Sequence, residues 1–354
     1  MFVAWRDLRF ARGRFVLIAT VVTLISILVG FLSGLTGGLA AQNVTGILTL
    51  GADRIVLAPS APGASPTWSD STVTADQLSL WKGADGVDDA IPLGVSQIRA
   101  QSAGERVAVT VFATPDGAQG APAADGAIAL SAPAAVALGA DVGDVITIAD
   151  DPYEVTSIAG DDWYSHTPVV RMALSQWQQL QSRTGGEADT ATAILVTGAA
   201  DWASVDASAG TTSQSSLGSL TLLPAFRSEI GSLLLIVVLL FGISALVIGA
   251  FFTVWTMQRR GDVAILKALG ATDGALVRDA LGQALVVLTA GTLIGTVIVL
   301  IAGLAVSGTL PYLLSPWTTI APAVLLIAVG LIGAAFALRA VTTASPLTAL
   351  GSNR

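Results

Sequence analysis

Long apolar segments interrupt the chain four times. The first runs without a charged residue from Phe15 to Ala52, and the second from Ile230 to Gln258. A helix rises about 1.5 Å per residue, so about 20 apolar residues cross the roughly 30 Å hydrocarbon core of a bilayer. The pattern predicts four transmembrane helices, over residues 15–37, 229–258, 274–306 and 323–339.

Residues 38–228 differ from these segments, because polar and apolar residues alternate and turns rich in Pro, Gly and Ser recur. Alternation predicts strands at 54–59, 106–113, 144–150 and 153–160. Helical spacing predicts helices at 74–82, 132–138 and 173–182, and residues 210–218 resemble a linker. The predicted fold is therefore membrane α-helical, with an extracellular α+β domain inserted after the first of four spans.

The distribution of charge predicts the topology. Outside residues 38–229 the chain has ten basic and four acidic residues, a net charge of +6. Residues 38–229 have seven basic and twenty-one acidic residues, a net charge of −14. By the positive-inside rule, residues 1–14, 259–273 and 340–354 are cytoplasmic, whereas 38–228 and the short loop 307–322 face outward. The acidity belongs to an exported domain and does not indicate a nucleic-acid partner.

Two features of the first span leave alternatives open. Residues 1–14 fit a helix lying on the inner leaflet and equally the positive flank of a span. The apolar run is longer than the 7–15 residues of a signal peptide, which favours an uncleaved span over a cleaved signal. Gly30, Gly34, Gly37 and Gly38 lie near one face, where they would allow a second helix to approach closely.

Composition restricts the chemistry. The chain has no cysteine and a single histidine, which leaves few candidates for catalysis or a metal site, and we predict neither. It also lacks the G-x-x-x-x-G-K-[ST] loop, so any ATP hydrolysis would fall to a separate subunit.

Several segments resemble the FtsX-like/MacB-like permeases of ABC transporters. The cytosolic signature of that family resembles MQRRGDVAILKALGATDGALVR (257–278), and an ectodomain pattern of the family resembles residues 129–160. The opening MFVAWRDLRFARGRFVLI and the stretch DDWYSHTPVVRMALSQWQ (161–178) look like HrtB-type permeases. This resemblance implies a homodimer with two copies of an ATPase that binds ATP and Mg, and haem as the substrate, with no intrinsic cofactor. The outer half of the first span contains no methionine, so no methionine there could serve as an axial ligand to haem iron.

Glu229 is the most informative residue beside the membrane. An ionised carboxylate at the membrane boundary costs free energy unless water or a partner contacts it. Its presence therefore indicates a functional or interfacial position. In a haem exporter Glu229 would approach the iron, Arg227 would meet a propionate and Phe226 would stack on the porphyrin. Tyr164 and His166 carry side chains that ligate haem elsewhere. The alternatives are a charged boundary residue at Glu229, packing at Tyr164 and a solvated loop at His166.

A second predicted site lies in the cytosolic segment 259–273. Its apolar residues recur on one stripe and would dock into a groove on the ATPase. The residues expected to couple the two subunits are Arg259, Arg260, Asp262, Val263, Leu266, Lys267 and Leu269.

These observations predict the permease subunit of an ABC efflux pump in the cell membrane. The predicted path takes haem, or another hydrophobic molecule, from the outer leaflet through a cleft at the dimer interface. The alternatives are an exporter of a peptide, lipid or lipoprotein, and an FtsX-type module that controls a cell-wall hydrolase.

Overall fold

The chain forms two compact units, which we describe separately. The computed structural model describes residues 12–61, 63–183, 190–258, 261, 270 and 272–342. The helical unit comprises Met1–Gly38 and Ser232–Arg354, and the inserted domain comprises Leu39–Gly231. Four long apolar helices with an α+β domain between the first and the second confirm the predicted fold class.

Four helices in the described part of the chain are long and apolar enough to cross a membrane. They are α2 (Arg12–Leu48), α8 (Pro224–Gln258), α10 (Asp273–Val306) and α11 (Pro316–Thr342). Helix α2 continues past residue 37, where the sequence predicts the span to end. Helix α8 begins at Pro224 rather than at 229, because proline fits the first helical turn. Both extensions lie in the inserted domain.

Helix α11 also begins earlier than predicted, so that part of the expected loop 307–322 is helical. Ser315 precedes the helix, and its hydroxyl accepts a hydrogen bond from the Thr318 amide at 3.3 Å. Pro316 follows as the first helical residue, and Pro322 lies inside the helix. A helix start of this type depends on the capping hydroxyl and on a proline at the first helical position.

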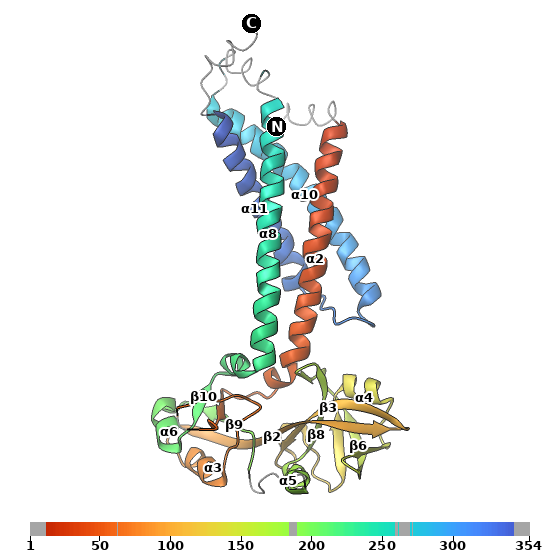
Figure 1. The fold of residues 1–354 in the computed structure, drawn as a ribbon, viewed down its shortest axis with the longest axis vertical. Helices are drawn as coiled ribbons and strands as arrows, with labels where there is room; N and C mark the ends of the chain where they lie inside the picture. The colour runs from red at the N-terminus through yellow and green to blue at the C-terminus, as the bar shows by residue number, and fades with distance from the viewer. Residues whose placement is uncertain are drawn as a thin grey trace. The chain divides into compact units, whose positions relative to one another are not determined.

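Helices α2 and α10 belong to the helical unit (Figure 1), and their close packing depends on small residues. A Cβ at Gly291 of α10 would lie 2.9 Å from the Ala19 carbonyl oxygen of α2, and one at Gly295 would lie 2.6 Å from Ser26. Thr23 of α2 donates a hydrogen bond to the Gly291 carbonyl at 3.0 Å. The spacing of the two glycines is the small-xxx-small pattern that brings membrane helices together.

The glycines of the first span contact a loop as well as a helix. A Cβ at Gly34 would lie 2.2 Å from the Tyr312 ring, and one at Gly38 would lie 1.9 Å from the Pro311 carbonyl oxygen. The Leu313 amide donates a hydrogen bond to the Gly34 carbonyl at 3.0 Å. Two of these glycines face a helix: Gly30 faces Val299 of α10, and Gly37 faces Thr318 of α11. The prediction of helix–helix contact is therefore wrong for Gly34 and Gly38, which admit the loop before α11.

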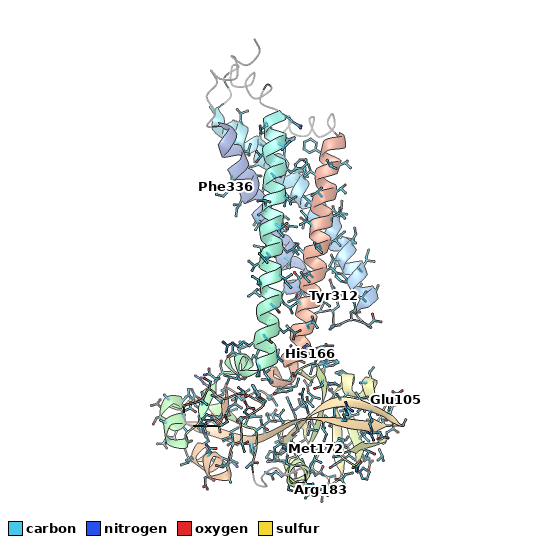
Figure 2. All side chains as sticks on the ribbon, in the orientation of Figure 1. Glu105, His166, Met172, Arg183, Tyr312 and Phe336 are labelled. Atoms are coloured by element: carbon cyan, nitrogen blue, oxygen red, sulfur yellow. The ribbon has the colours of Figure 1, made fainter. Side chains whose placement is uncertain are left out.

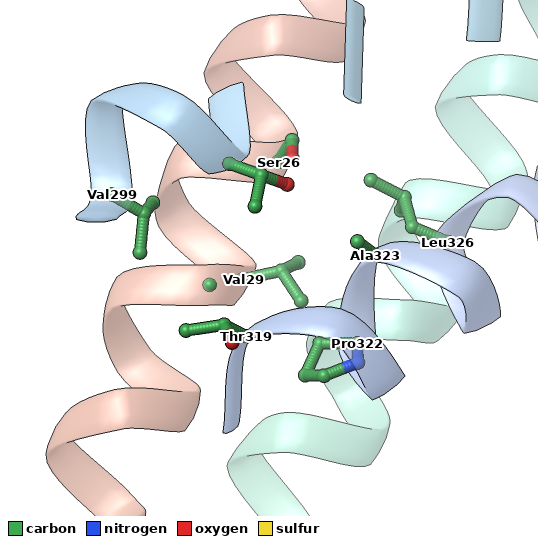
Figure 3. Close-up of a pocket in the computed structure, with 9 residues that line it drawn as sticks. Ser26, Val29, Val299, Thr319, Pro322, Ala323 and Leu326 are labelled. Carbon is green, nitrogen blue, oxygen red and sulfur yellow. The ribbon is translucent and has the colours of Figure 1, made fainter. Parts of the chain in front are cut away.

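A small cavity lies among α2, α10 and α11 (Figure 3). Its lining includes Ser26, Val29, Thr319 and Pro322. It has room for about one water molecule. This cavity is therefore too small to be a site for a substrate of the size of haem.

One half of the inserted domain is a closed barrel of six strands. Pairing runs from β2 through β3, β8, β4, β6 and β5, and β5 pairs with β2 again. The core is apolar and contains residues such as Ile128, Val155 and Met172, and helices α4 and α5 contribute to it. The elements are β2 (Val87–Ser102), β3 (Glu105–Thr114), β4 (Ala127–Leu130), β5 (Val145–Ile148), β6 (Asp151–Ile158), β8 (Thr167–Ala173), α4 (Ala132–Leu138) and α5 (Leu174–Arg183).

The other half is an open sheet with the order β10–β1–β9–β2. Strand β2 belongs to both halves, because its first part pairs with β9 and its second part with β3. Gly94 lies at this change of partner, where a Cβ would be 2.5 Å from the Trp177 ring. The elements are β1 (Arg54–Leu57), β9 (Ala193–Gly198), β10 (Thr212–Gln214), α3 (Ala75–Lys82) and α6 (Trp202–Ala209).

The strands and helices predicted in this domain all have counterparts, in β1, β3, β5, β6, α3, α4 and α5. The prediction of a linker at 210–218 is wrong, because Thr212–Gln214 form β10 and pair with β1. Helix α7 (Ser216–Ser219) follows, capped by the Ser215 hydroxyl. Polar residues can form an edge strand when a neighbouring strand supplies the hydrogen bonds, and the sequence does not reveal that neighbour.

Candidate functional site

Three polar side chains from distant parts of the sequence meet within the inserted domain. Nδ2 of Asn43 donates a hydrogen bond to Oε2 of Glu229 at 2.7 Å. Nε2 of His166 lies 2.8 Å from the same oxygen and 3.1 Å from Nδ2 of Asn43. We call these three residues the Asn–His–Glu cluster. A proton on Nε2 satisfies the carboxylate, so the shared oxygen of Glu229 accepts from both neighbours.

A tight hairpin positions His166 (Figure 2). Strand β7 (Trp163–Tyr164) pairs with β8, and Ser165 and His166 form the two-residue turn between them. Both turn residues have positive φ, at 46° and 64°. That conformation closes a two-residue hairpin, and histidine, like asparagine and aspartate, adopts it more readily than serine does. Such strain persists where surrounding contacts enforce it, and it is often found at functional sites.

Helix α2 supplies the contacts that hold this turn. The amide of Ser165 donates to the carbonyl of Asn43 at 3.1 Å, and the amide of His166 donates to the carbonyl of Gln42 at 3.0 Å. The amide of Trp163 donates to the Thr45 hydroxyl at 2.9 Å. The last turns of α2 therefore fix the backbone of His166 beside Asn43.

A buried ion pair anchors the base of the hairpin. Nη2 of Arg171 on β8 donates to Oδ2 of Asp162 at 2.6 Å, and the two side chains are 15% and 5% exposed. The Thr49 hydroxyl donates to Oδ1 of the same carboxylate at 2.9 Å. Asp162 is itself buried and therefore links the hairpin to α2.

Helix α8 positions Glu229 within its first turns. Phe226 packs against the apolar cluster of the domain that includes Leu220 and Leu223, and Arg227 is exposed. The side chains of His166 and Glu229 are 37% and 25% exposed, so a ligand can reach them, while Asn43 is completely buried. The structure thus brings together the predicted residues Glu229 and His166 and adds Asn43, which sequence reasoning missed. The signal available in the sequence was a pair of amide side chains, Gln42 and Asn43, near the end of the first uncharged segment.

Tyr164 lies in the core of the domain. Its ring packs edge-on against Trp68 and Phe112, with centroids 6.0 and 5.6 Å away, and 6% of the residue is exposed. Burial raises the pKa of its phenol far above the ordinary value of about 10. An iron ligand from tyrosine is the ionised form, so this environment argues against Tyr164 as a haem ligand. The alternative interpretation, packing, describes its surroundings.

The arrangement of the cluster suits a ligand with a hard or borderline metal centre or with hydrogen-bond donors. A carboxylate and an imidazole, both partly exposed, offer oxygen and nitrogen donor atoms side by side. Among the described residues, no group of three or more His, Cys, Asp or Glu side chains is placed to hold a metal ion. The coupling residues Arg259, Arg260, Asp262, Val263, Leu266, Lys267 and Leu269 lie outside the described residues.

Comparison with known proteins identifies the class of protein. Residues 234–346 match the family described as FtsX-like permease C-terminal. The chain is 25% identical over 360 residues to a Staphylococcus haemolyticus protein named as a hemin transport system permease, HrtB, with 99% of each chain covered. It is 23% identical to an uncharacterised ABC transporter permease of Mycobacterium bovis, again with 99% of each chain covered. Residues 234–346 therefore form an FtsX-like permease domain, and the full-length relatives are named as transport permeases.

One solved structure similar to this permease is the periplasmic region of MacB from Actinobacillus actinomycetemcomitans. The sequence identity is 12% and the TM-score is 0.36, with 48% of this chain and 92% of that chain covered. Four apolar helices and an FtsX-like permease domain indicate a membrane protein. Membership among ABC transporter permeases implies an ATPase partner.

Proposed function

We propose that this permease exports haem, and that the Asn–His–Glu cluster forms part of the haem site. The Staphylococcus relative, named for hemin transport and aligned over its full length, supports haem as the substrate. The cluster is the observation that carries the site, because a partly exposed carboxylate and imidazole share one short contact of 2.8 Å. Either side chain can approach haem iron once that contact opens.

Neighbouring residues suit the rest of the molecule. The exposed guanidinium of Arg227 can pair with a propionate through two parallel hydrogen bonds. Phe226 is partly buried, and its free face can stack on the porphyrin. Tyr164 is left out of this site for the reasons given above.

The assembly we propose is a homodimer of the permease with two ATPase subunits, which bind ATP and Mg. The N- and C-termini face the cytoplasm, as the positive charges beside the apolar helices favour. The cytosolic segment 259–273 docks on the ATPase. Since α8 extends from Pro224 to Gln258, one helix connects the neighbourhood of this segment with Glu229. Helix α8 would transmit the movement of the ATPase pair to the haem site. This movement would open a cleft at the dimer interface toward the outer leaflet.

The test is a titration of the purified permease in detergent with haemin, followed by its Soret absorbance. We expect a saturable, shifted band for the natural sequence. Glu229→Gln keeps the shape of the side chain and removes its charge, and we expect it to weaken binding at least tenfold. We expect His166→Ala to shift the Soret band, because it removes either a ligand of the iron or the side chain next to that ligand.

A matched control is Asp161→Asn, which removes an exposed carboxylate from the loop before the same hairpin. It should bind haemin like the natural sequence. Equal affinities for Glu229→Gln and the control would remove the cluster from the haem site. The absence of any band beyond that of haemin in detergent would reject haem as the substrate, and the assignment as an FtsX-type permease would stand.

A further inference from the structure

Asn43 is a buried amide that uses only one of its two polar ends. The residue is completely buried, and its Nδ2 donates to Glu229 at 2.7 Å. Its Oδ1 is also buried and has no hydrogen-bond partner among the described residues. An unpaired buried acceptor costs stability, which an apolar side chain of the same shape would avoid. The amide is therefore not explained by the stability of the domain.

The backbone contacts show what the amide contributes to the cluster. His166 is fixed beside α2 by main-chain hydrogen bonds of its own turn. Glu229 has a rotatable side chain on another helix, and the contact from Nδ2 of Asn43 reaches the oxygen that also faces Nε2 of His166. Removal of that donor takes away one of the contacts that hold Oε2 of Glu229 at the imidazole.

We propose that Asn43 is a positioning residue, which holds the carboxylate of Glu229 against His166. By donating to Oε2, the amide orients the carboxylate, as outer-shell partners orient the ligands of metal sites. The consequence for haem binding rests on the proposed function. The geometry of the Asn–His–Glu cluster itself does not depend on that proposal, so it can be tested without haem.

The first experiment uses the single histidine of the chain as a reporter. The full-length permease, purified with a tag that contains no histidine, is labelled with ¹⁵N-histidine, and the ring-nitrogen NMR signals are recorded in detergent without haem. Asn43→Leu removes both polar atoms and keeps the approximate shape. We expect its spectrum to lose the Nε2–carboxylate signature and to match that of Glu229→Gln.

An exchange of the amide and the carboxylate between positions 43 and 229 provides a second test, which applies even when Asn43→Leu does not fold. Asn43→Asp alone sets two carboxylates against each other and should disturb the imidazole signals. Combined with Glu229→Gln, it restores an amide–carboxylate pair, with the carboxylate now on α2 near Nε2 of His166. We expect the double variant to regain a hydrogen bond from Nε2 to a carboxylate.

The matched control is Thr36→Val on the same helix, because its buried Oγ1 also has no partner among the described residues. Its imidazole spectrum should equal that of the natural sequence. Imidazole signals in folded Asn43→Leu that equal those of the control would overturn the proposal, since the amide would then only fill space.

The second experiment measures haemin affinity. We expect Asn43→Leu to weaken binding by about 10–100-fold and to shift the Soret band, as loss of an outer partner does at metal sites. Should the natural sequence bind no haemin, the proposed function fails, and the NMR experiment still decides the role of Asn43. Should Glu229→Gln weaken binding and Asn43→Leu leave affinity and spectrum unchanged, the positioning role in haem binding is rejected.

Discussion

The buried pair of Asp162 and Arg171 gives a prediction about the stability of the hairpin that carries His166. The carboxylate is 5% exposed, and it accepts from Arg171 at 2.6 Å and from Thr49 at 2.9 Å. In Asp162→Ala the guanidinium stays buried, with the Gln119 carbonyl as its remaining partner in the described structure.

Breaking a buried pair by removing one partner costs about 3–5 kcal/mol, because the other charge remains without compensation. For a domain of this size, 1 kcal/mol lowers the melting temperature by about 2–4 °C. We therefore expect Asp162→Ala to melt about 6–20 °C below the natural sequence. The double variant Asp162→Leu with Arg171→Met removes both charges and should melt close to the natural sequence or above it.

The measurement is thermal unfolding of the full chain in detergent, followed by tryptophan fluorescence, since Trp68 and Trp177 are buried in this domain. The control is the exposed pair of Asp151 and Arg183, whose side chains are 37% and 59% exposed. Exposed pairs contribute about 0–1 kcal/mol, so Asp151→Ala should barely change the melting temperature. Equal losses in Asp162→Ala and Asp151→Ala would refute the argument that burial makes the first pair costly to break.

Two further predictions concern other parts of the molecule. Gly38→Ala should destabilise the helical unit by about 1–3 kcal/mol, because the new Cβ would meet the Pro311 carbonyl at 1.9 Å, whereas Gly242→Ala, with nothing within 4 Å, should be neutral or stabilising. Thermal aggregation in detergent compares the two, and equal midpoints would contradict the close contact. Burial raises the pKa of Tyr153 and Tyr164, so their stabilising contribution is complete below pH 10 and is lost as pH rises above that value. Ultraviolet titration should show that their tyrosinate absorbance appears at higher pH in the folded protein than in urea. Appearance at the same pH in both conditions would contradict the burial.

Local patterns predicted those parts of the fold that local physics determines. Uncharged runs of 20 or more residues indicate membrane helices, because only a closed set of backbone hydrogen bonds tolerates hydrocarbon. Alternation and helical spacing predicted elements such as β3 and α3, since the side-chain period is visible within a few consecutive residues. Long-range pairing was not predictable in this way. Strand β2 was missed, although it connects both halves of the domain, because Pro92 and Gly94 interrupt its strand pattern and its partner β9 lies about a hundred residues further along the chain.

The candidate site was also predictable only in part. The sequence by itself marked Glu229 and His166, because an acidic residue beside an apolar run and a single histidine are conspicuous in composition and position. It could not show that the two side chains lie 2.8 Å apart, that Asn43 bonds to the same oxygen, or that Tyr164 is in the core. Those facts follow from the docking of a two-residue turn onto α2, a contact between residues more than a hundred positions apart. The identity of a residue decides which interactions it can make, and only the tertiary structure decides which partners it meets.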